Sequence, residues 1–173
     1  MALYALGEVE PSIDPRAFVH PDATVIGAVT IGAETTVWAQ AVLRGDVGRI
    51  TVGARTSIQD GSVVHATTEL WTDIGDDCVV GHLAHLEGCV VESGALIGSG
   101  SIVLHRARIC SGALVGAGAL VPNGMEVPTG AMALGVPAKL RHDAVEAETM
   151  IAPNARAYVE NGRRYLKELR RIS

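Results

Sequence analysis

The sequence predicts an all-β protein, a parallel β-helix built from six-residue repeats, followed by a C-terminal α-helix. Three observations support this prediction: aliphatic residues recur at every sixth position, aromatic residues make up only 3% of the chain, and 20 of its 173 residues are glycine. A period of six excludes an amphipathic helix or a coiled coil, whose hydrophobic periods lie near 3.6 and 3.5 residues. Six-residue repeats are typical of β-helices, in which each unit supplies a short strand and a turn.

The repeat is carried by a series of aliphatic residues, called the anchors below. The anchors are Ile13, Val19, Val25, Ile31, Val37, Leu43, Val52, Ile58, Val64, Ile74, Val80, Leu86, Val91, Ile97, Val103, Ile109, Val115, Val121, Val127 and Ala133. Successive anchors are six positions apart, except for a nine-residue step after Leu43, a ten-residue step after Val64 and a five-residue step after Leu86. About three units make one triangular coil, so we expect the anchors to stack in a column inside the β-helix. The ten-residue step predicts an extruded loop at residues 66–73.

The C-terminal part of the chain has a different pattern. After Pro137 the six-residue period ends, and apolar residues return at helical spacing from about Pro153 to Ile172. Proline suits the first turn of a helix, where its missing N–H costs little. A shorter helix is predicted over residues 144–150. We therefore expect a single domain in which the hexapeptide-repeat β-helix occupies residues 1–140 and a helical tail, residues 141–173, packs on its outside.

Composition excludes several classes of function. The net charge of −5 argues against nucleic acid as the main partner. No apolar run approaches the length of a membrane span, and the N-terminus lacks a basic, hydrophobic signal, so we expect a cytoplasmic protein without a membrane partner. The three cysteines, Cys78, Cys89 and Cys110, form no CxxC pair. They are interpreted as reduced packing or surface residues rather than metal ligands.

Polar residues that interrupt the regular repeat are the candidates for chemistry. They form three clusters: Arg44, Gly45 and Asp46; Gln59, Asp60 and His65; and His82, His85 and Glu87. Each cluster contains a residue that directly follows an anchor and so points outward. If the ten-residue step is extruded, His65 and Glu87 lie one coil apart and stack about 5 Å from each other. His85 and Glu87 flank the inward-pointing Leu86, and alternation along a strand places both on the same outward face.

The three clusters suggest a metal site shared between subunits. His82 lies two positions after the anchor Val80, near a corner on another side of the coil, so one chain does not easily bring it to His65. A closed cyclic trimer does, because it juxtaposes different faces of identical chains. Two imidazoles and a carboxylate suit Zn²⁺, and three protein ligands leave one position for a water with a pKa near 7. Fe²⁺ and Co²⁺ are alternatives. The remaining histidines, His20, His105 and His142, are interpreted as surface residues.

Two motifs carry a resemblance to a known family. They are the run Leu43-Arg44-Gly45-Asp46 and the run from Ile58 to His65, IQDGSVVH, which is followed by Gly81-His82. Over about residues 11–141 the chain resembles the γ-class carbonic anhydrase-like hexapeptide proteins. The resemblance implies a left-handed β-helix, a homotrimer with metal sites between subunits, and reversible hydration of CO₂ to bicarbonate by a metal-bound hydroxide. It also implies that His65 of one subunit and His82 of the next bind the metal. The residues it assigns to the interface and the metal-bound water are Arg44, Asp46, Gln59 and Asp60.

The chain departs from the family pattern at one metal ligand. The third histidine of the family falls five residues after the equivalent of His82, where this chain has Glu87, and His85 stands two residues earlier. Three outcomes remain open: a His, His, Glu site, a shifted site that uses His85, or a lost site on an intact scaffold. A carboxylate donates more negative charge than an imidazole, which raises the pKa of the bound water. The alternatives to CO₂ hydration are therefore metal-dependent hydrolysis of a thioester or other small acyl substrate, and a non-catalytic trimeric scaffold or metal-binding protein.

Overall fold

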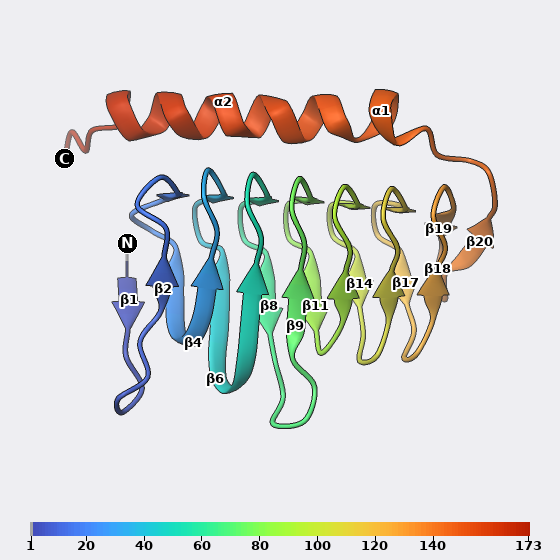
Figure 1. Ribbon diagram of the computed structural model, residues 1–173, viewed down its shortest axis with the longest axis horizontal. Helices are drawn as coiled ribbons and strands as arrows, with labels where there is room; N and C mark the ends of the chain where they lie inside the picture. Colours follow the sequence, from blue (N-terminus) through green and yellow to red (C-terminus); the bar gives the residue numbers. More distant parts are fainter. Residues whose placement is uncertain (1) are drawn as a thin grey trace.

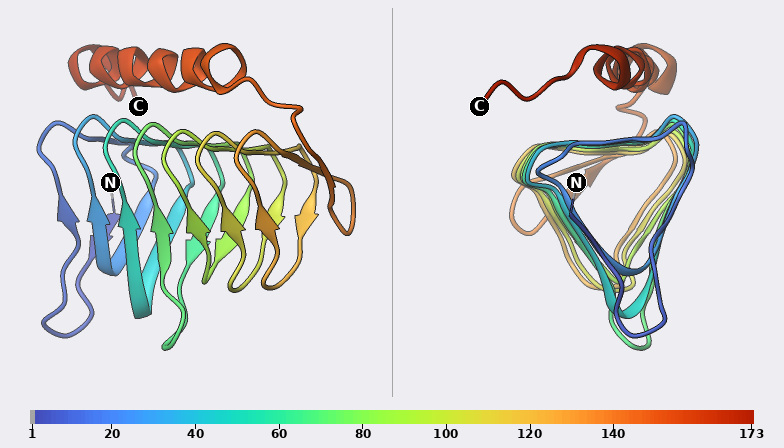
Figure 2. Two further views of the ribbon diagram at one scale, coloured as in Figure 1. Left: turned by 45° about the vertical axis from the view of Figure 1, so that its right-hand side comes forward. Right: turned by 90° about the vertical axis from the view of Figure 1, so that its left-hand side faces the viewer.

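The chain winds into a left-handed parallel β-helix of about seven coils (Figure 1). The computed structural model describes residues 2–173. Viewed along its axis, the β-helix is a triangular prism with three flat faces, and one of the faces lies beneath the C-terminal helix (Figure 2). Strands in successive coils pair in parallel, for example Val25 with Leu43 and Ile97 with Val115, both 18 residues apart. This pairing confirms the predicted fold class and three repeats per regular coil.

The first face is a sheet of eight short strands. In order of sequence they are β3 (Phe18–Val19), β5 (Thr36–Val37), β7 (Ser57–Ile58), β10 (Val79–Val80), β13 (Leu96–Ile97), β16 (Leu114–Val115), β19 (Met132–Leu134) and β20 (Lys139–Arg141). All pair in parallel except β20, which folds back antiparallel on β19. The last coil therefore ends on a strand that runs against the direction of the others.

The second and third faces belong to one sheet of 12 strands, because two long strands, β4 (Thr24–Ile31) and β6 (Val42–Val52), run around the corner between them. The second face also contains β1 (Ala2–Tyr4), β8 (Val63–His65), β11 (His85–Glu87), β14 (Ile102–Val103) and β17 (Leu120–Val121). The third face also contains β2 (Ser12–Ile13), β9 (Thr72–Ile74), β12 (Val90–Val91), β15 (Arg108–Ile109) and β18 (Glu126–Val127).

The anchors form the core, as the repeat predicts. From Val25 to Ala133 every anchor is at most 2% exposed, whereas Ile13 and Val19 in the first coil are partly buried. The small residues that precede the anchors by two positions, such as Ala41 and Ser62, are also fully buried. Cys78 and Cys89 are buried, and burial raises the pKa of these thiols to about 11 and about 12, so both stay protonated at neutral pH.

The irregular steps place extra residues at the corner between the second and third faces, the lowest corner in the right-hand view of Figure 2. The nine-residue step lies within β6, which turns this corner over residues 45–49. The ten-residue step forms a loop over residues 66–71, shorter than the predicted 66–73. Thr72 and Asp73 leave the loop because they pair with Ile50 and Thr51 of β6 and so begin β9. The irregular steps thus leave the anchor column continuous.

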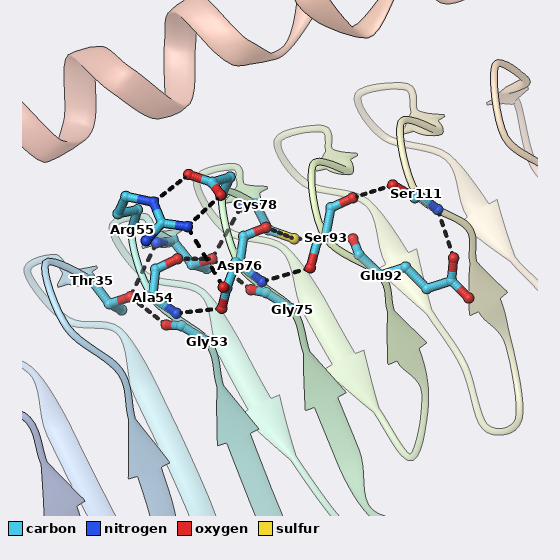
Figure 3. A network of polar contacts seen from close by, with 12 residues as sticks. Thr35, Gly53, Ala54, Arg55, Gly75, Asp76, Cys78, Glu92, Ser93 and Ser111 are labelled. Carbon is cyan, nitrogen blue, oxygen red and sulfur yellow. Dashed lines mark hydrogen bonds and ion pairs between the residues drawn. The ribbon is translucent and has the colours of Figure 1, made fainter.

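Figure 3 shows how polar side chains connect the stacked turns at the corner between the third and first faces. The hydroxyl of Thr35 donates to the carbonyl of Gly53 at 2.6 Å, and the Asp76 carboxylate accepts the N–H of Ala54 at 2.7 Å. Arg55 forms an ion pair with Asp77 at 2.7 Å. Each bond joins one coil to the next, so turns that lack regular strand pairing are still held in register.

The tail forms a short helix α1 (Ala147–Met150) and a long helix α2 (Ala152–Glu168), with Pro153 in the first turn of α2. The predicted helical pattern extends to Ile172, but α2 ends at Glu168. Leu169 and Ile172 lie beyond this end, where they are 43% and 82% exposed and border a cleft with residues 20–22 of the first coil. No helix among residues 2–173 combines the length and apolar character needed to cross a membrane.

Helix α2 packs on the first face through β3, β5 and β7. Its aromatic side chains meet the buried Trp38: the ring of Tyr165 lies 4.9 Å and that of Tyr158 lies 5.6 Å from the indole, measured between centroids. Gly162 allows the closest approach, because a Cβ at this position would lie 2.5 Å from the Thr36 methyl. Arg163 adds an ion pair to Glu34 at the adjacent corner. The helix thus covers the sheet surface around Trp38.

If the anchor column supplies the main stabilisation, a cavity within it must cost far more than a lost surface contact. Leu43 is fully buried and Leu166 of α2 is 53% exposed. We expect Leu43→Ala to lower the free energy of unfolding by about 3–5 kcal/mol, and Leu166→Ala by about 0.5 kcal/mol or less. Urea unfolding followed by circular dichroism, at one fixed protein concentration, measures both. Equal losses in the two variants would contradict a core built on the anchors.

Candidate metal centre

The candidate centre begins with a contact between two neighbouring coils on the second face. Strands β8 and β11 pair so that Glu87 lies beside His65, the stacking that the sequence spacing predicts. The Nδ1 atom of His65 is 2.8 Å from Oε1 of Glu87, and its Nε2 atom is 3.2 Å from Oδ1 of Asp46. The imidazole is 15% exposed. Carboxylates from two other coils therefore hold both of its ring nitrogens.

Arg44 and Asp46 extend this arrangement along β6. Arg44 stacks beside His65 in the strand register and forms an ion pair with Asp46. Burial raises the pKa of Asp46, but the hydrogen bonds from Arg44 and His65 outweigh this effect and hold the pKa below its ordinary value. Asp46 is therefore an ionised acceptor that fixes the orientation of the imidazole. The arginine and the aspartate face each other within one chain.

His85 contacts the other oxygen of Glu87. The two residues flank buried Leu86 and point outward together, as strand alternation predicts. Nε2 of His85 is 3.4 Å from Oε2 of Glu87. The carboxylate thus has an imidazole at each oxygen, and it is 22% exposed.

A third imidazole at Glu87 corrects one interpretation made from the sequence. His105 is not a simple surface residue: its Nε2 atom is buried, lacks any hydrogen-bond partner among the described residues, and lies 3.8 Å from Oε1 of Glu87. The signal that could have found it is the offset of 17 residues in this coil, which includes the five-residue step and places His105 level with Gly88, the residue after Glu87. Burial raises the pKa of Glu87, but the hydrogen bond and charge of His65 and the other imidazoles lower it, and the result is a pKa below the ordinary value.

His82 and Asp60 lie at the opposite edge of the second face. Both belong to turns at the corner shared with the first face, and Nδ1 of His82 is 2.9 Å from Oδ2 of Asp60. Gln59, next to Asp60, is buried at 4% exposed. Within residues 2–173 no hydrogen bond or ion pair connects His82 to His65 or Glu87. One chain therefore brings together Arg44, Asp46, His65, His85 and Glu87 from the three clusters. Asp60 and His82 pair with each other at the other edge of the face.

The donor atoms at Glu87 suit a borderline divalent cation, because imidazole nitrogens and carboxylate oxygens are the usual ligands of Zn²⁺ and Fe²⁺. The orphaned Nε2 of His105 shows that the polar groups at Glu87 are not fully satisfied by one another. In the part of the chain that the structure describes, no group of three or more His, Cys, Asp or Glu residues has the geometry to hold a metal ion. The residues fit a metal chemically, but a centre that uses His82 requires a second chain.

A cleft of about 340 Å³ borders the candidate centre at Asp46. Its walls include four apolar side chains that are about half exposed: Leu6, Val9, Val47 and Trp71. The guanidinium of Arg49 lies 4.3 Å from the centroid of the Trp71 ring. The cleft is formed by Leu6 and Val9 near the N-terminus together with Ala28, the corner segment 45–49 and Trp71. A small apolar group placed in this cleft would lie next to Asp46, which contacts His65.

The fold and these side chains define a hexapeptide-repeat protein with a histidine and carboxylate cluster on one face. The chain belongs to the γ-class carbonic anhydrase-like family, in agreement with the resemblance in its motifs. It is 46% identical over 156 residues to the carbonic anhydrase of Geobacillus kaustophilus, an alignment that covers 90% of this chain and 86% of that protein. No family model matches the chain.

Other relatives have different names. The chain is 42% identical over 104 residues to the carnitine operon protein CaiE of Escherichia coli O157:H7, and the match covers 60% of this chain but only 53% of CaiE. A hexapeptide transferase family protein from Anaplasma phagocytophilum superimposes with a TM-score of 0.90 at 38% identity, covering 95% of this chain and 98% of that one. A putative acetyltransferase from Bacillus cereus gives 0.92 at 35% identity, covering 95% and 96%.

The packing beneath the candidate centre can be tested at a glycine. Gly88 has a φ of +60°, and a Cβ there would lie 2.9 Å from both the His105 ring and Leu70. Gly118 has a similar φ of +68° with nothing within 4 Å. We expect Gly118→Ala to cost about 1 kcal/mol, from backbone strain alone, and Gly88→Ala about 2–4 kcal/mol, because strain and overpacking add. Urea unfolding of the two variants gives the difference. Equal costs would contradict the close packing of His105 and Leu70 over Gly88.

Proposed function

We propose that the protein is a homotrimeric, γ-carbonic anhydrase-like metalloenzyme that catalyses the reversible hydration of CO₂ to bicarbonate. The observation that carries this proposal is the contact of His65 with Glu87 and Asp46 on an outward face of the β-helix. The proposed metal is Zn²⁺, with Fe²⁺ or Co²⁺ as alternatives. Kinship with a carbonic anhydrase at 46% identity supports the reaction class.

The side chains have distinct roles in this proposal. His65 and Glu87 of one subunit and His82 of the next bind the ion, which when bound supplies a hydroxide nucleophile near neutral pH. Asp46 accepts the Nε2–H of His65 and fixes the orientation of the ring, and Nδ1 would exchange its contact with Oε1 of Glu87 for the ion. Asp60 has the same role for His82, at 2.9 Å. In this scheme Arg44 holds Asp46 in place and Gln59 orients the nucleophile.

The position of His82 supports the proposed trimer. Since His82 and the cluster at Glu87 lie at opposite edges of the second face, only a neighbouring chain can bring them together. Light scattering at low micromolar concentration should give a mass near three times 18.0 kDa. A stable monomer that still binds one metal ion would contradict the shared site.

Glu87 makes a second candidate reaction worth testing. A carboxylate ligand makes the metal a weaker Lewis acid than an imidazole does, which disfavours hydration of CO₂ at neutral pH. The apolar cleft at Asp46 is also larger than CO₂ requires, and its volume of about 340 Å³ lies in the range of small-molecule sites. Metal-dependent hydrolysis of a thioester or another small acyl substrate, at a centre held by the same residues, is therefore the alternative reaction.

The metal content of the protein separates an enzyme from a scaffold. Purified protein supplied with Zn²⁺, Fe²⁺ or Co²⁺ should bind about one ion per chain, because a trimer with three interfaces has three equivalent sites. His65→Ala and His82→Ala should each remove the ion, since each deletes one of three ligands, and both should leave the trimer folded. His20→Ala, at a partly buried histidine that directly follows β3 in the first coil, is the matched control. A wild-type protein that takes up none of the three metals would support the non-catalytic scaffold instead.

The loaded protein then identifies the third ligand and the reaction. Glu87→Ala should weaken metal binding strongly and His85→Ala only modestly, and the reverse order would mean that His85 is the ligand. Glu87→His should increase CO₂ hydration, measured by stopped flow with a pH indicator, if the carboxylate suppresses it. No increase in a trimeric, fully loaded variant, together with turnover of a small acyl thioester by the wild type, would favour the hydrolase.

A further inference from the structure

Glu87 is surrounded by more imidazoles than the proposed metal ligands account for. Its Oε1 atom is 2.8 Å from Nδ1 of His65 and 3.8 Å from Nε2 of His105, and its Oε2 atom is 3.4 Å from Nε2 of His85. Of these three ring nitrogens, only the one on His105 is buried without a hydrogen-bond partner among residues 2–173. A buried polar atom without a partner is uncommon and calls for an explanation.

The backbone around His105 holds this imidazole in place. Its carbonyl accepts the N–H of Gly124 at 2.9 Å, and the next residue, Arg106, donates its N–H to the carbonyl of Gly88 at 2.7 Å. The turn is thus bonded to the coils on both sides. The absence of a side chain at Gly88 leaves room for the ring, since a Cβ there would be 2.9 Å from Cδ2 of His105. The ring therefore points at Glu87 from a fixed backbone.

We propose that His105 is a positioning residue of the metal centre, whose Nε2–H donates to Oε1 of Glu87 and leaves Oε2 as the oxygen that binds the cation. This inference rests on the proposed function. The present separation of 3.8 Å exceeds a hydrogen bond, and a ring movement of about 0.8 Å would bring it to about 3.0 Å. Glu87 is the one acceptor that forms an ion-pair contact with Nε2 of His105 in the described part of the chain.

A hydrogen bond from His105 to Glu87 would matter in this chain because glutamate stands where the family has a histidine ligand. A carboxylate has two equivalent oxygens and can turn about its last bond, whereas an imidazole offers a fixed direction. An N–H donated to one oxygen fixes which oxygen faces the ion, and it draws negative charge away from the metal. Nδ1 of His65 would leave Oε1 to bind the ion, and the N–H of His105 at Oε1 would then compensate in part for the replacement of the family's histidine by Glu87.

Cobalt binding tests this proposal without relying on activity. Co²⁺ is titrated into the metal-free trimer of the wild type, His105→Ala, His105→Gln and His142→Ala, and binding is followed by the visible absorption of the ion. His105→Ala should bind about 10–100-fold more weakly, the usual effect of losing a residue that orients a ligand. His105→Gln should recover most of the affinity, because its amide N–H can donate to Glu87. His142→Ala, at an exposed histidine, should match the wild type.

Each result decides a different claim. Wild-type affinity and spectrum in His105→Ala would overturn the role of His105 and leave the proposed function intact. A loss in His105→Ala that glutamine does not restore, with a matching fall in the melting temperature of the metal-free protein, would mean that the ring only packs. If the wild type binds no Co²⁺, Zn²⁺ or Fe²⁺, the proposed function fails, and the role of His105 fails with it.

Discussion

The stacking of anchors inside the β-helix determines where every other side chain lies. The interior of each coil is filled by aliphatic chains that are at most 2% exposed from Val25 onward, so a coil cannot slip against its neighbour without moving an anchor out of the core. Because the buried anchors fix the register of the coils, they also fix the register of the outward-pointing side chains. Residues that directly follow anchors therefore become neighbours along the prism, although many residues separate them in the sequence.

The candidate metal centre depends on this constraint more than on local structure. His65 and Glu87 are separated by 22 residues, yet their side chains touch because their anchors, Val64 and Leu86, pair in adjacent strands. The centre also depends on corners, where backbone leaves the strand pairing. His105 lies in such a turn, and Asp46 lies where β6 bends. Strands thus supply the spacing of the cluster, and corners supply the side chains that close around it.

The sequence was sufficient for the features that follow the repeat. The anchor column, the triangular coil and the neighbouring positions of His65 and Glu87 all follow from counting residues. Features that depend on the geometry of the turns, such as the contact of His105 with Glu87, could not be predicted from the repeat. The five-residue step after Leu86 shifts the strand pairing, so Gly88 rather than Glu87 is level with His105, and only the direction of the ring brings it back to Glu87. The end of α2 was missed because apolar spacing continues after the sheet beneath the helix has ended. The roles of the clusters in binding a metal remain predictions.

The long corner between the second and third faces affects more than the path of the backbone. A loop that becomes longer there adds little entropic cost, about 0.6 kcal/mol for each doubling of its length, and it displaces no anchor. The segment 45–49 and Trp71, at the end of the loop 66–71, also form walls of the cleft beside Asp46. The volume of this cleft can therefore change independently of the stability of the fold. Proteins that share this β-helix and the same stacked side chains can differ in the size of the molecule that reaches them, simply through the number of residues at one corner.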